Sequence, residues 1–379
     1  MSQAAASIIK TDHKLAAKAH VRQVGGQFQP GSMKAEIKPR IELENRTKLE
    51  EVIPLETPFI VSVDPADICN FQCKFCPTGN RALMKRIKRN SGLMDFDLYK
   101  KIIADLCEFE KPIKVLRLYK DGEPLLNPRF ADMIRYAKKS GCALQVDTTT
   151  NGSLLNPARN LEIIEAGLDR INISLEGLSP ASYKEFAKYN IDFDKFVDNL
   201  RHFYEHKQDC TVSIKIVGDF LSEEEKIRFF EIFGDISDRV FIEHVAPCWP
   251  EFEMKEVVPS REVGIYGQEL REIEICPYIF YSLSINADGT ASLCFLDWSR
   301  KLIVGDVKTE SFKQIWQGEA LFAYQKMHLL KKRQEHPICA VCGQLTHCLP
   351  DDIDPFAEML LERLESSRNK GVADGRVVI

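Results

Sequence analysis

No run of apolar residues in this sequence approaches the roughly 18 consecutive residues that a membrane-spanning helix needs. The polar N-terminus also lacks the apolar core of a secretion signal. Basic residues are not in excess, since the formal net charge is −5, and such a chain has no general attraction to nucleic acid or anionic lipid. These absences predict a cytoplasmic protein that binds neither nucleic acid nor a membrane.

Cysteine, in contrast, is frequent, with 12 residues in a chain of 379. A short secreted chain with this content would be expected to form disulfides, but this chain is long and lacks an export signal. Most of its cysteines also fall into patterns typical of metal ligands, which favours a reducing compartment. Of the others, Cys107, Cys142 and Cys210 have the surroundings of plain buried thiols. Cys248 follows a strand end, and its sequence surroundings do not assign it to the buried thiols.

The middle of the chain alternates between apolar segments typical of buried strands and segments with helical periodicity. The expected strands are Phe59–Val63, Ile113–Leu118, Ala143–Val146, Arg170–Leu175, Thr211–Val217 and Val240–Val245. The expected helices are Asp95–Phe109, Pro128–Ser140, Pro157–Ala166, Pro180–His206 and Ser222–Phe233. Such alternation favours a parallel sheet curled into a barrel. The predicted fold class is therefore α/β, with a partial (β/α)6 TIM-like barrel.

Four loops with cysteine, polar or glycine residues follow strands of this barrel. They are Cys69–Cys76, Asp121–Pro124, Thr149–Gly152 and Ser174–Gly177. The carboxyl ends of the strands form the working face of such barrels. We therefore expect the four loops to surround one site.

After Pro250 the alternation stops, and a second, smaller module is predicted. Ala287-Asp288-Gly289 between two strand-like segments indicates a hairpin. Helical patterns follow at Ser311–Gly318, Ala320–Lys332 and Asp354–Glu365. The predicted organisation is a loose N-terminal extension (1–56), a barrel (57–250), the smaller module (251–349) and a C-terminal helix with a tail (350–379).

The first cysteine motif, Cys69-x3-Cys73-x2-Cys76, stands on one short loop after an apolar strand. Three thiolates at this spacing can hold three irons of a 4Fe–4S cluster and leave the fourth iron open to bind a cofactor. The spacing differs from that of zinc sites and of four-cysteine ferredoxin motifs. A zinc site or simple packing is the alternative.

A second set of cysteines belongs to the smaller module: Cys276, Cys294, Cys339, Cys342 and Cys348. Four thiolates from separate segments can ligate an auxiliary 4Fe–4S cluster completely. A structural zinc site with four cysteine ligands is the alternative. Cys348 is a fifth cysteine, and it is either a further ligand or a spare thiol.

The first motif, with Phe75 before its third cysteine, resembles the signature of the radical S-adenosylmethionine (SAM) superfamily. The module resembles the SPASM/twitch extensions of that superfamily, through Cys276, the Gly-x4-Cys element at Gly289–Cys294 and the Cys-x2-Cys-x5-Cys element at Cys339–Cys348. Full SPASM domains carry further cysteines downstream. Because none follows Cys348, the resemblance implies the shorter type with one auxiliary cluster. The spacing is similar to that of 2-deoxy-scyllo-inosamine dehydrogenases.

The resemblance also implies residues that bind SAM. Gly122-Glu123-Pro124 matches the turn that receives the methionyl amino group, although Asp121 replaces the usual first glycine. Ser174 and Glu176 match a polar pair that contacts the ribose or the methionyl carboxylate, and Val217 lies in the strand that borders adenine. Each could instead be a turn residue or a polar group at the barrel rim.

Charged residues inside otherwise apolar strands are the candidates for substrate binding and catalysis, since burying a charge requires a partner. Arg117 and Lys215 are expected to bind an anionic or hydroxyl-rich substrate, to take a proton, or to form structural ion pairs. Glu243 and His244 end the last strand, and histidine suits proton transfer near neutral pH. A structural role is the alternative for both.

The resemblance implies a reaction that begins with reductive cleavage of SAM to a 5′-deoxyadenosyl radical. We expect this radical to remove hydrogen from a sugar or cyclitol and a secondary alcohol to become a ketone. The electron donor would be an external protein such as flavodoxin or ferredoxin. Maturation of a ribosomal peptide and redox-neutral sugar epimerisation, with a cysteine such as Cys248 returning hydrogen, are the alternatives. A non-enzymatic electron carrier or zinc scaffold is a third.

Overall fold

A ten-stranded sheet in the order β1-β7-β6-β5-β4-β3-β2-β8-β9-β10 is the centre of the computed structural model. The structure describes residues 33–41, 46–89, 91–254, 257 and 262–373. The strands are β1 (Glu36–Ile37), β2 (Ile60–Val63), β3 (Ile113–Arg117), β4 (Ala143–Thr150), β5 (Arg170–Leu175), β6 (Thr211–Val217), β7 (Arg239–Glu243), β8 (Ser282–Ile285), β9 (Thr290–Ser292) and β10 (Ile303–Asp306).

The helices are α2 (Leu49–Val52), α3 (Arg81–Ile87), α4 (Phe96–Leu106), α5 (Phe130–Ser140), α6 (Pro157–Ala166), α7 (Pro180–Phe186), α8 (Phe193–His206), α9 (Glu223–Phe233), α10 (Phe312–Trp316), α11 (Glu319–Leu329), α12 (Pro337–Ala340), α13 (Gln344–His347) and α14 (Ala357–Ala373). Within the described ranges, no helix combines the length and the apolar character that crossing a membrane requires.

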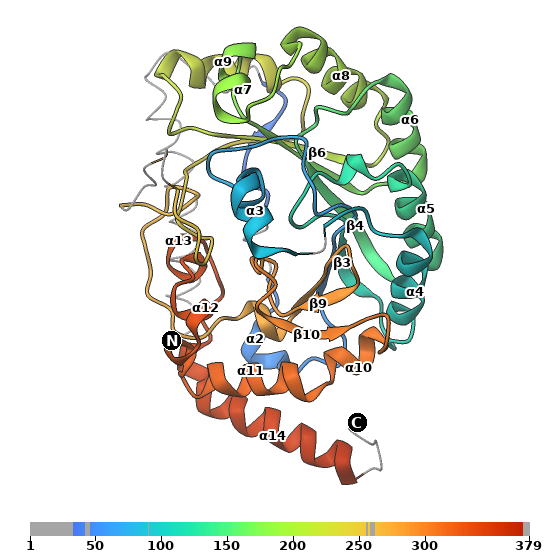
Figure 1. Ribbon diagram of the computed structural model, residues 1–379, viewed down its shortest axis with the longest axis vertical. Coiled ribbons are helices and arrows are strands. Elements are labelled where there is room, and N and C mark those ends of the chain that lie inside the picture. Colours follow the sequence, from blue (N-terminus) through green and yellow to red (C-terminus); the bar gives the residue numbers. More distant parts are fainter. Residues whose placement is uncertain (1–32, 42–45, 90, 255–256, 258–261, 374–379) are drawn as a thin grey trace.

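Strands β2 to β7 pair in parallel and in chain order, and helices α4, α5, α6 and α8 lie outside the curved sheet (Figure 1). Each of these four helices buries an apolar stripe. In α8, for example, Phe196, Leu200 and Phe203 recur at helical spacing and are buried. This arrangement confirms the α/β fold with a partial TIM-like barrel.

One expected helix, Pro180–His206, is wrong in its length, because the structure breaks it into α7 and α8. Lys188 has a left-handed backbone with φ 51°, which a continuous helix does not allow. Asp192 then caps the new helix, since its side chain accepts a hydrogen bond from the Lys195 amide. The cap signal was present in the sequence but was hidden by the apolar periodicity on both sides.

The expectation of a loose N-terminal extension is wrong for its described part, whereas residues 1–32 lie outside the described residues. Glu36 and Ile37 form β1, which pairs in parallel with the outer edge of β7. The Ala35 amide donates to the Gly234 carbonyl at 2.9 Å, and the Lys38 amide donates to the Val240 carbonyl at 3.1 Å. This segment therefore extends one edge of the barrel sheet and leads the chain to Arg40.

The C-terminal module extends the opposite edge, since β8 pairs in parallel with β2. Strands β8 and β9 form the expected hairpin, and β10, which the sequence did not reveal, continues it antiparallel. Gly305 in β10 has no room for a side chain, because a Cβ would come within 2.7 Å of Ile315 in α10. Helices α10, α11 and α14 lie along this part of the molecule (Figure 1).

A buried group of six charged residues joins the barrel to the module. Its members are Asp64, Asp67, Arg89, Lys120, Asp121 and Arg300, and we call it the junction cluster. Asp121 Oδ2 lies 2.9 Å from Lys120 Nζ, 3.2 Å from Arg89 Nη1 and 3.1 Å from Arg300 Nη2. Arg300 comes from the module and also contacts Asp67 at 3.1 Å. The cluster therefore ties the two parts together through charges that water does not screen.

Arg300→Ala tests this role. The substitution leaves Asp67 and Asp121 with too little positive charge, and removing one partner of a buried pair typically costs about 3–5 kcal/mol. We expect the free energy of unfolding of the full chain to fall by that amount in an anaerobic denaturant titration.

Lys301→Ala is the matched control, because Lys301 is the next residue and pairs with Glu251 on the surface, where both side chains are at least 36% exposed. A surface pair contributes about 0–1 kcal/mol. Equal losses in the two variants would contradict a special role for the junction cluster.

Candidate functional site

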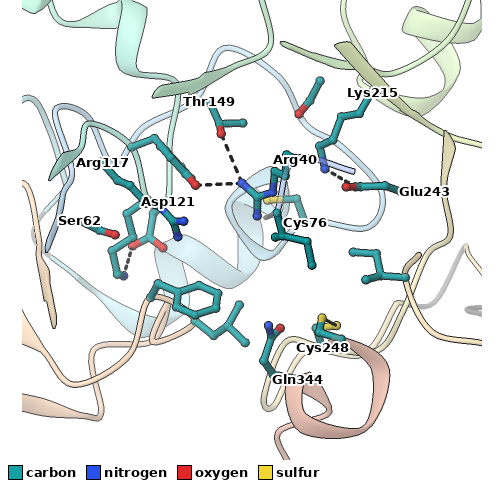
Figure 2. Close-up of a pocket in the computed structure, with 18 of the residues that line it drawn as sticks. Arg40, Ser62, Cys76, Arg117, Asp121, Thr149, Lys215, Glu243, Cys248 and Gln344 are labelled. Atoms are coloured by element: carbon teal, nitrogen blue, oxygen red, sulfur yellow. Dashed lines mark hydrogen bonds and ion pairs between the residues drawn. The ribbon is translucent and has the colours of Figure 1, made fainter. Parts of the chain in front are cut away.

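A cavity of about 690 Å³ opens inside the barrel and extends to the module (Figure 2). Most of the residues predicted for the first cluster, the cofactor and the substrate line it. They are Cys69, Cys73, Phe75, Cys76, Arg117, Gly122, Glu123, Ser174, Glu176, Lys215, Val217, Glu243 and His244. The structure therefore brings together, at one site, residues that are up to 175 positions apart by number (69 to 244).

The three cysteines of the first motif stand on a tightly folded loop after β2. The Gln72 amide donates to the Ala187 carbonyl at 2.8 Å, which fixes the loop to the end of α7. Gly79 closes the loop, since a Cβ there would lie 2.5 Å from the Cys73 carbonyl oxygen. A loop held in this way presents its sulfur atoms to the cavity.

Burial raises the pKa of Cys69 to about 12 and also raises that of Cys76. Both thiols therefore keep their protons in the metal-free chain, and metal binding must release them. Three cysteine sulfurs on one cavity wall are a donor set that fits three irons of a 4Fe–4S cluster.

The Asp121–Pro124 turn forms a neighbouring wall. Gly122 is required there, because a Cβ would come within 2.2 Å of the carbonyl oxygens of Ala66 and Ile68. Asp121, which stands where a glycine was expected, supplies the central carboxylate of the junction cluster. Pro124 begins a short 3-10 helix and is buried, and it does not line the cavity.

Glu123 is buried and its carboxylate is held in place by three hydrogen bonds. It accepts from Thr150 Oγ1 at 2.6 Å, from the Asn151 amide at 2.8 Å and from the Leu125 amide at 3.0 Å. Burial raises the pKa of Glu123, although these donors oppose the shift. The carboxylate is thus oriented in advance of any ligand, as a group that receives an ammonium ion must be.

Ser174 and Glu176 lie at the carboxyl end of β5, where they line the cavity beside Cys73. Burial raises the pKa of Glu176 to about 7, against a hydrogen bond with Cys73 that lowers it. Its Oε2 atom is buried and has no hydrogen-bond partner among the described residues. Phe75 stacks on Phe220 with ring centroids 6.4 Å apart, which gives this side of the cavity an apolar surface.

The charged residues on the substrate side are paired and still face the cavity (Figure 2). Lys215 donates to Glu243, so both residues form a structural pair that remains accessible from the cavity. His244 Nδ1 lies 3.3 Å from Asp219 Oδ1. Arg117 Nε lies 3.9 Å from Asp147 Oδ2, so a structural ion pair, one of the alternatives for Arg117, is present at long range.

The sequence analysis missed Arg40, which comes from the segment after β1 and lies at the centre of the cavity (Figure 2). Arg40 Nη1 donates to Tyr119 Oη at 2.9 Å and is 3.4 Å from Thr149 Oγ1. Nothing in the irregular polar sequence around Arg40 indicates this position. Thr149 belongs to the segment Thr149–Gly152 that was expected at the site, although the structure places it near the end of β4. Tyr119 was not expected there.

Four cysteines of the module line a second, smaller cavity between the hairpin and the helices that follow: Cys276, Cys294, Cys339 and Cys342. His328 accepts a hydrogen bond from the Cys276 amide at 3.2 Å, and Arg333 donates to the Cys339 carbonyl at 2.6 Å. Burial raises the pKa of Cys276 to about 12. Four thiols from three separate segments fit a fully ligated cluster.

Cys348, for which the sequence left a further ligand and a spare thiol as alternatives, lines the first cavity and not the second. Its sulfur lies 3.7 Å from the sulfur of Cys248, and both residues are buried. Cys294 and Cys342, which line the four-cysteine cavity, pack against the small apolar cluster that contains both residues. The two thiols therefore line the first cavity and lie close to the four-cysteine site.

Two family models match the chain in the regions where these sites lie. The model described as the radical SAM superfamily matches residues 63–231, and the SPASM model, described as an iron–sulfur cluster-binding domain, matches residues 276–343. The first contains Cys69, Cys73 and Cys76, and the second contains the four cysteines of the smaller cavity.

Two curated relatives match over most of their length at low identity. A cofactor-modifying protein of the tungsten-containing aldehyde ferredoxin oxidoreductase from Pyrococcus furiosus is 24% identical over 320 residues, which are 74% of this chain and 86% of that protein. An AdoMet-dependent heme synthase from Methanosarcina barkeri is 21% identical over 67% of this chain and 80% of its own.

Solved structures share the fold. BtrN in complex with AdoMet and 2-DOIA has a TM-score of 0.50 at 16% identity, over 78% of this chain and 97% of its own. Native anSMEcpe with bound AdoMet has a TM-score of 0.54 at 13% identity, over 84% of this chain and 100% of its own. SuiB of Streptococcus suis bound to S-adenosylmethionine has a TM-score of 0.53 at 14% identity, over 79% of this chain and 74% of its own.

The matched regions imply the cofactors that the two cysteine sets fit, namely a 4Fe–4S cluster with SAM in the barrel and auxiliary iron–sulfur binding in the module. With its partial barrel, its three-cysteine loop and its four-cysteine module, the chain contains a radical SAM domain at residues 63–231 and a SPASM domain at residues 276–343.

Proposed function

We propose that this enzyme oxidises a secondary alcohol of a small polyhydroxylated substrate, such as a sugar or cyclitol, to a ketone. The observation that carries the proposal is a single cavity lined by the three-cysteine loop and by polar and charged barrel residues, next to the four-cysteine site. When bound, the reduced cluster and SAM supply a 5′-deoxyadenosyl radical, and an auxiliary cluster supplies an acceptor for one electron.

The chain's own residues would hold and orient these groups. Cys69, Cys73 and Cys76 would ligate the first cluster, and Glu123 would receive the methionyl ammonium. Ser174 and Glu176 would contact the ribose or the methionyl carboxylate. Phe75 and Val217 would border the adenine, with the Gly122–Pro124 turn positioning Glu123.

Alcohol oxidation removes a hydrogen atom, a proton and an electron from the substrate. The Lys215–Glu243 pair faces the cavity, and the Glu243 carboxylate is the group placed to accept the proton from the hydroxyl. His244 and Arg117 line the same space and would orient substrate oxygens. An external protein such as flavodoxin or ferredoxin would supply the first electron.

We assign Cys276, Cys294, Cys339 and Cys342 as ligands of one auxiliary 4Fe–4S cluster, because they share one cavity. Cys348 is set apart from that cavity and is not included. The corresponding domain limits are the barrel at 57–250, the module at 251–349 and the terminal helix at 350–379, with the N-terminal segment completing the barrel.

The fold neighbours do not select one substrate class. The BtrN structure contains 2-DOIA, whereas another SuiB structure contains the precursor peptide SuiA. We favour the small substrate because the cavity is lined with charged and polar barrel residues, which suit a compound rich in hydroxyl groups.

A second candidate reaction is redox-neutral epimerisation. Cys248 lines the cavity and has Cys348 as a neighbour at 3.7 Å, so a thiol is present that can return a hydrogen atom to a carbon radical. That reaction would leave the alcohol in place and invert its carbon.

Replacing Cys69, Cys73 and Cys76 together with alanine tests the first cluster site. We expect the reconstituted chain to lose about four of its irons and all SAM cleavage, because each cluster holds four irons. Iron analysis and chromatographic detection of 5′-deoxyadenosine measure both effects.

Cys107→Ala is the control, since this cysteine lies away from both cavities. The prediction that Cys107 is buried is wrong, because the structure exposes it. Retention of full iron content by the triple variant would contradict the assignment of the three-cysteine loop.

Cys339→Ser and Cys348→Ser separate the auxiliary ligands from the spare thiol. We expect the Cys339 variant to fall from about eight irons per chain to about four, whereas the Cys348 variant stays near eight. Loss of iron in the Cys348 variant alone would show that the ligand set is wrong.

The substrate class is tested by incubating the anaerobic holoenzyme, SAM and a chemical reductant with sugars and cyclitols or with peptides. We expect polyols to stimulate 5′-deoxyadenosine release and to yield a carbonyl product. Stimulation by peptides alone would contradict the proposal. Deuterium uptake from heavy water at a retained alcohol carbon, abolished in Cys248→Ala, would establish epimerisation instead.

A further inference from the structure

The cavity contains more positive charge than its carboxylates balance. Most of its cations have a carboxylate partner: Lys120 pairs with Asp121, Lys215 with Glu243 and Arg46 with Asp351. Arg40 forms no ion pair among the described residues, and its guanidinium contacts the hydroxyl groups of Tyr119 and Thr149 instead. A guanidinium is always charged, so this positive charge is not compensated.

Two further arginines lie near Arg40 and share a single carboxylate. Arg117, Asp147 and Arg170 are register partners on the adjacent strands β3, β4 and β5. Arg170 donates to Asp147, whereas Arg117 Nε is 3.9 Å from it, which is too far for a hydrogen bond. Three guanidinium groups therefore face one buried carboxylate.

These arginines also have unused donors. The Nε atoms of Arg40, Arg117 and Arg170 are buried and have no hydrogen-bond partner within the described part of the chain. A buried donor without a partner costs free energy, and a buried charge costs more. The cost is recovered when an acceptor with negative charge occupies the space between them.

The pKa of Tyr119 reflects the same excess of positive charge in the cavity. Burial alone would raise the pKa of this phenol, but the guanidinium groups of Arg117 and Arg40 outweigh it and lower that pKa. The acidic groups that face Arg40 do not neutralise its positive charge, because Glu243 is already paired with Lys215 and Asp147 with Arg170.

Arg40 is firmly positioned for this role. The preceding residues are bonded to the barrel through the Ala35 and Lys38 amides, and β1 pairs with β7. Tyr119 Oη and Thr149 Oγ1 then fix the guanidinium from inside the cavity, and Figure 2 shows the contact with Thr149. A pre-oriented guanidinium loses little freedom when it binds an anion.

We propose that Arg40, Arg117 and Arg170 form an anion-binding subsite that receives a phosphate or carboxylate group of the substrate. Guanidinium groups recognise both through paired charge-assisted hydrogen bonds. The assignment rests on the proposed function and narrows it, because the substrate becomes a polyhydroxylated compound that carries negative charge.

The test measures binding rather than turnover, so that it stands apart from the test of alcohol oxidation. Full-length, anaerobically reconstituted protein is titrated by calorimetry with inorganic phosphate, with acetate and with SAM, at constant ionic strength set by chloride. We expect phosphate or acetate to bind, and Arg40→Gln to raise the Kd of that anion roughly tenfold or more, since a charge-assisted pair is lost. The stronger of the two anions identifies the substrate group.

Arg46→Gln is the matched control, because Arg46 lines the same cavity but already has Asp351 as a partner. Its anion affinity should equal that of the wild type, and Arg40→Lys should recover part of the loss.

If Arg40→Gln loses its clusters and cannot be compared, Arg117→Gln replaces it in the same titration. Equal anion affinity in wild type and variant would overturn the subsite. A raised Kd for SAM with unchanged anion binding would also overturn it, because Arg40 would then serve the cofactor. Anion binding that survives while no alcohol is oxidised would leave the subsite standing and reject the proposed reaction.

Discussion

The arrangement of the barrel and the module depends on the ion pairs that the buried carboxylate of Asp121 forms. Asp121 lies in the turn that also carries Glu123, yet one of its oxygens is 3.1 Å from Arg300 of the module. Because an unpaired buried charge is costly, Asp121 and its cations hold one another in place. These ion pairs couple the cavity wall that presents Glu123 to the module with the four-cysteine site. This coupling is a reason why position 121 is aspartate and not the usual glycine.

Backbone pairing reinforces this coupling at both edges of the barrel sheet. β8 of the module continues the sheet beyond β2, and β1 continues it beyond β7. Hydrogen-bonded strands fix register as well as distance, since a slip of one residue turns every side chain to the other face. The cavity is thus enclosed by described residues from three regions of the chain, and β1 and β8 join the outer two regions to the barrel sheet.

The sequence predicted the barrel, the cysteine loop and the hairpin because each leaves a local pattern: alternation of apolar segments, fixed spacing or a turn signal. It did not predict β10 or the break at Lys188, where short elements leave little periodicity. It also missed Arg40, since a two-residue strand has no pattern, and its partners Tyr119 and Thr149 are distant in sequence. Cys348 was grouped with the other cysteines of the module because of its spacing in the sequence, although its place in the structure depends on tertiary packing.

The position of Arg40 has a consequence for how such enzymes diversify. It lies outside both matched regions, 63–231 and 276–343, on a segment that enters the barrel from its edge. Changes in this segment can alter which compounds the cavity accepts while the radical-generating machinery stays the same. Two relatives with identical core motifs can then act on different compounds, and the residues that separate them would be found in the leading strand rather than in the motifs that define the superfamily.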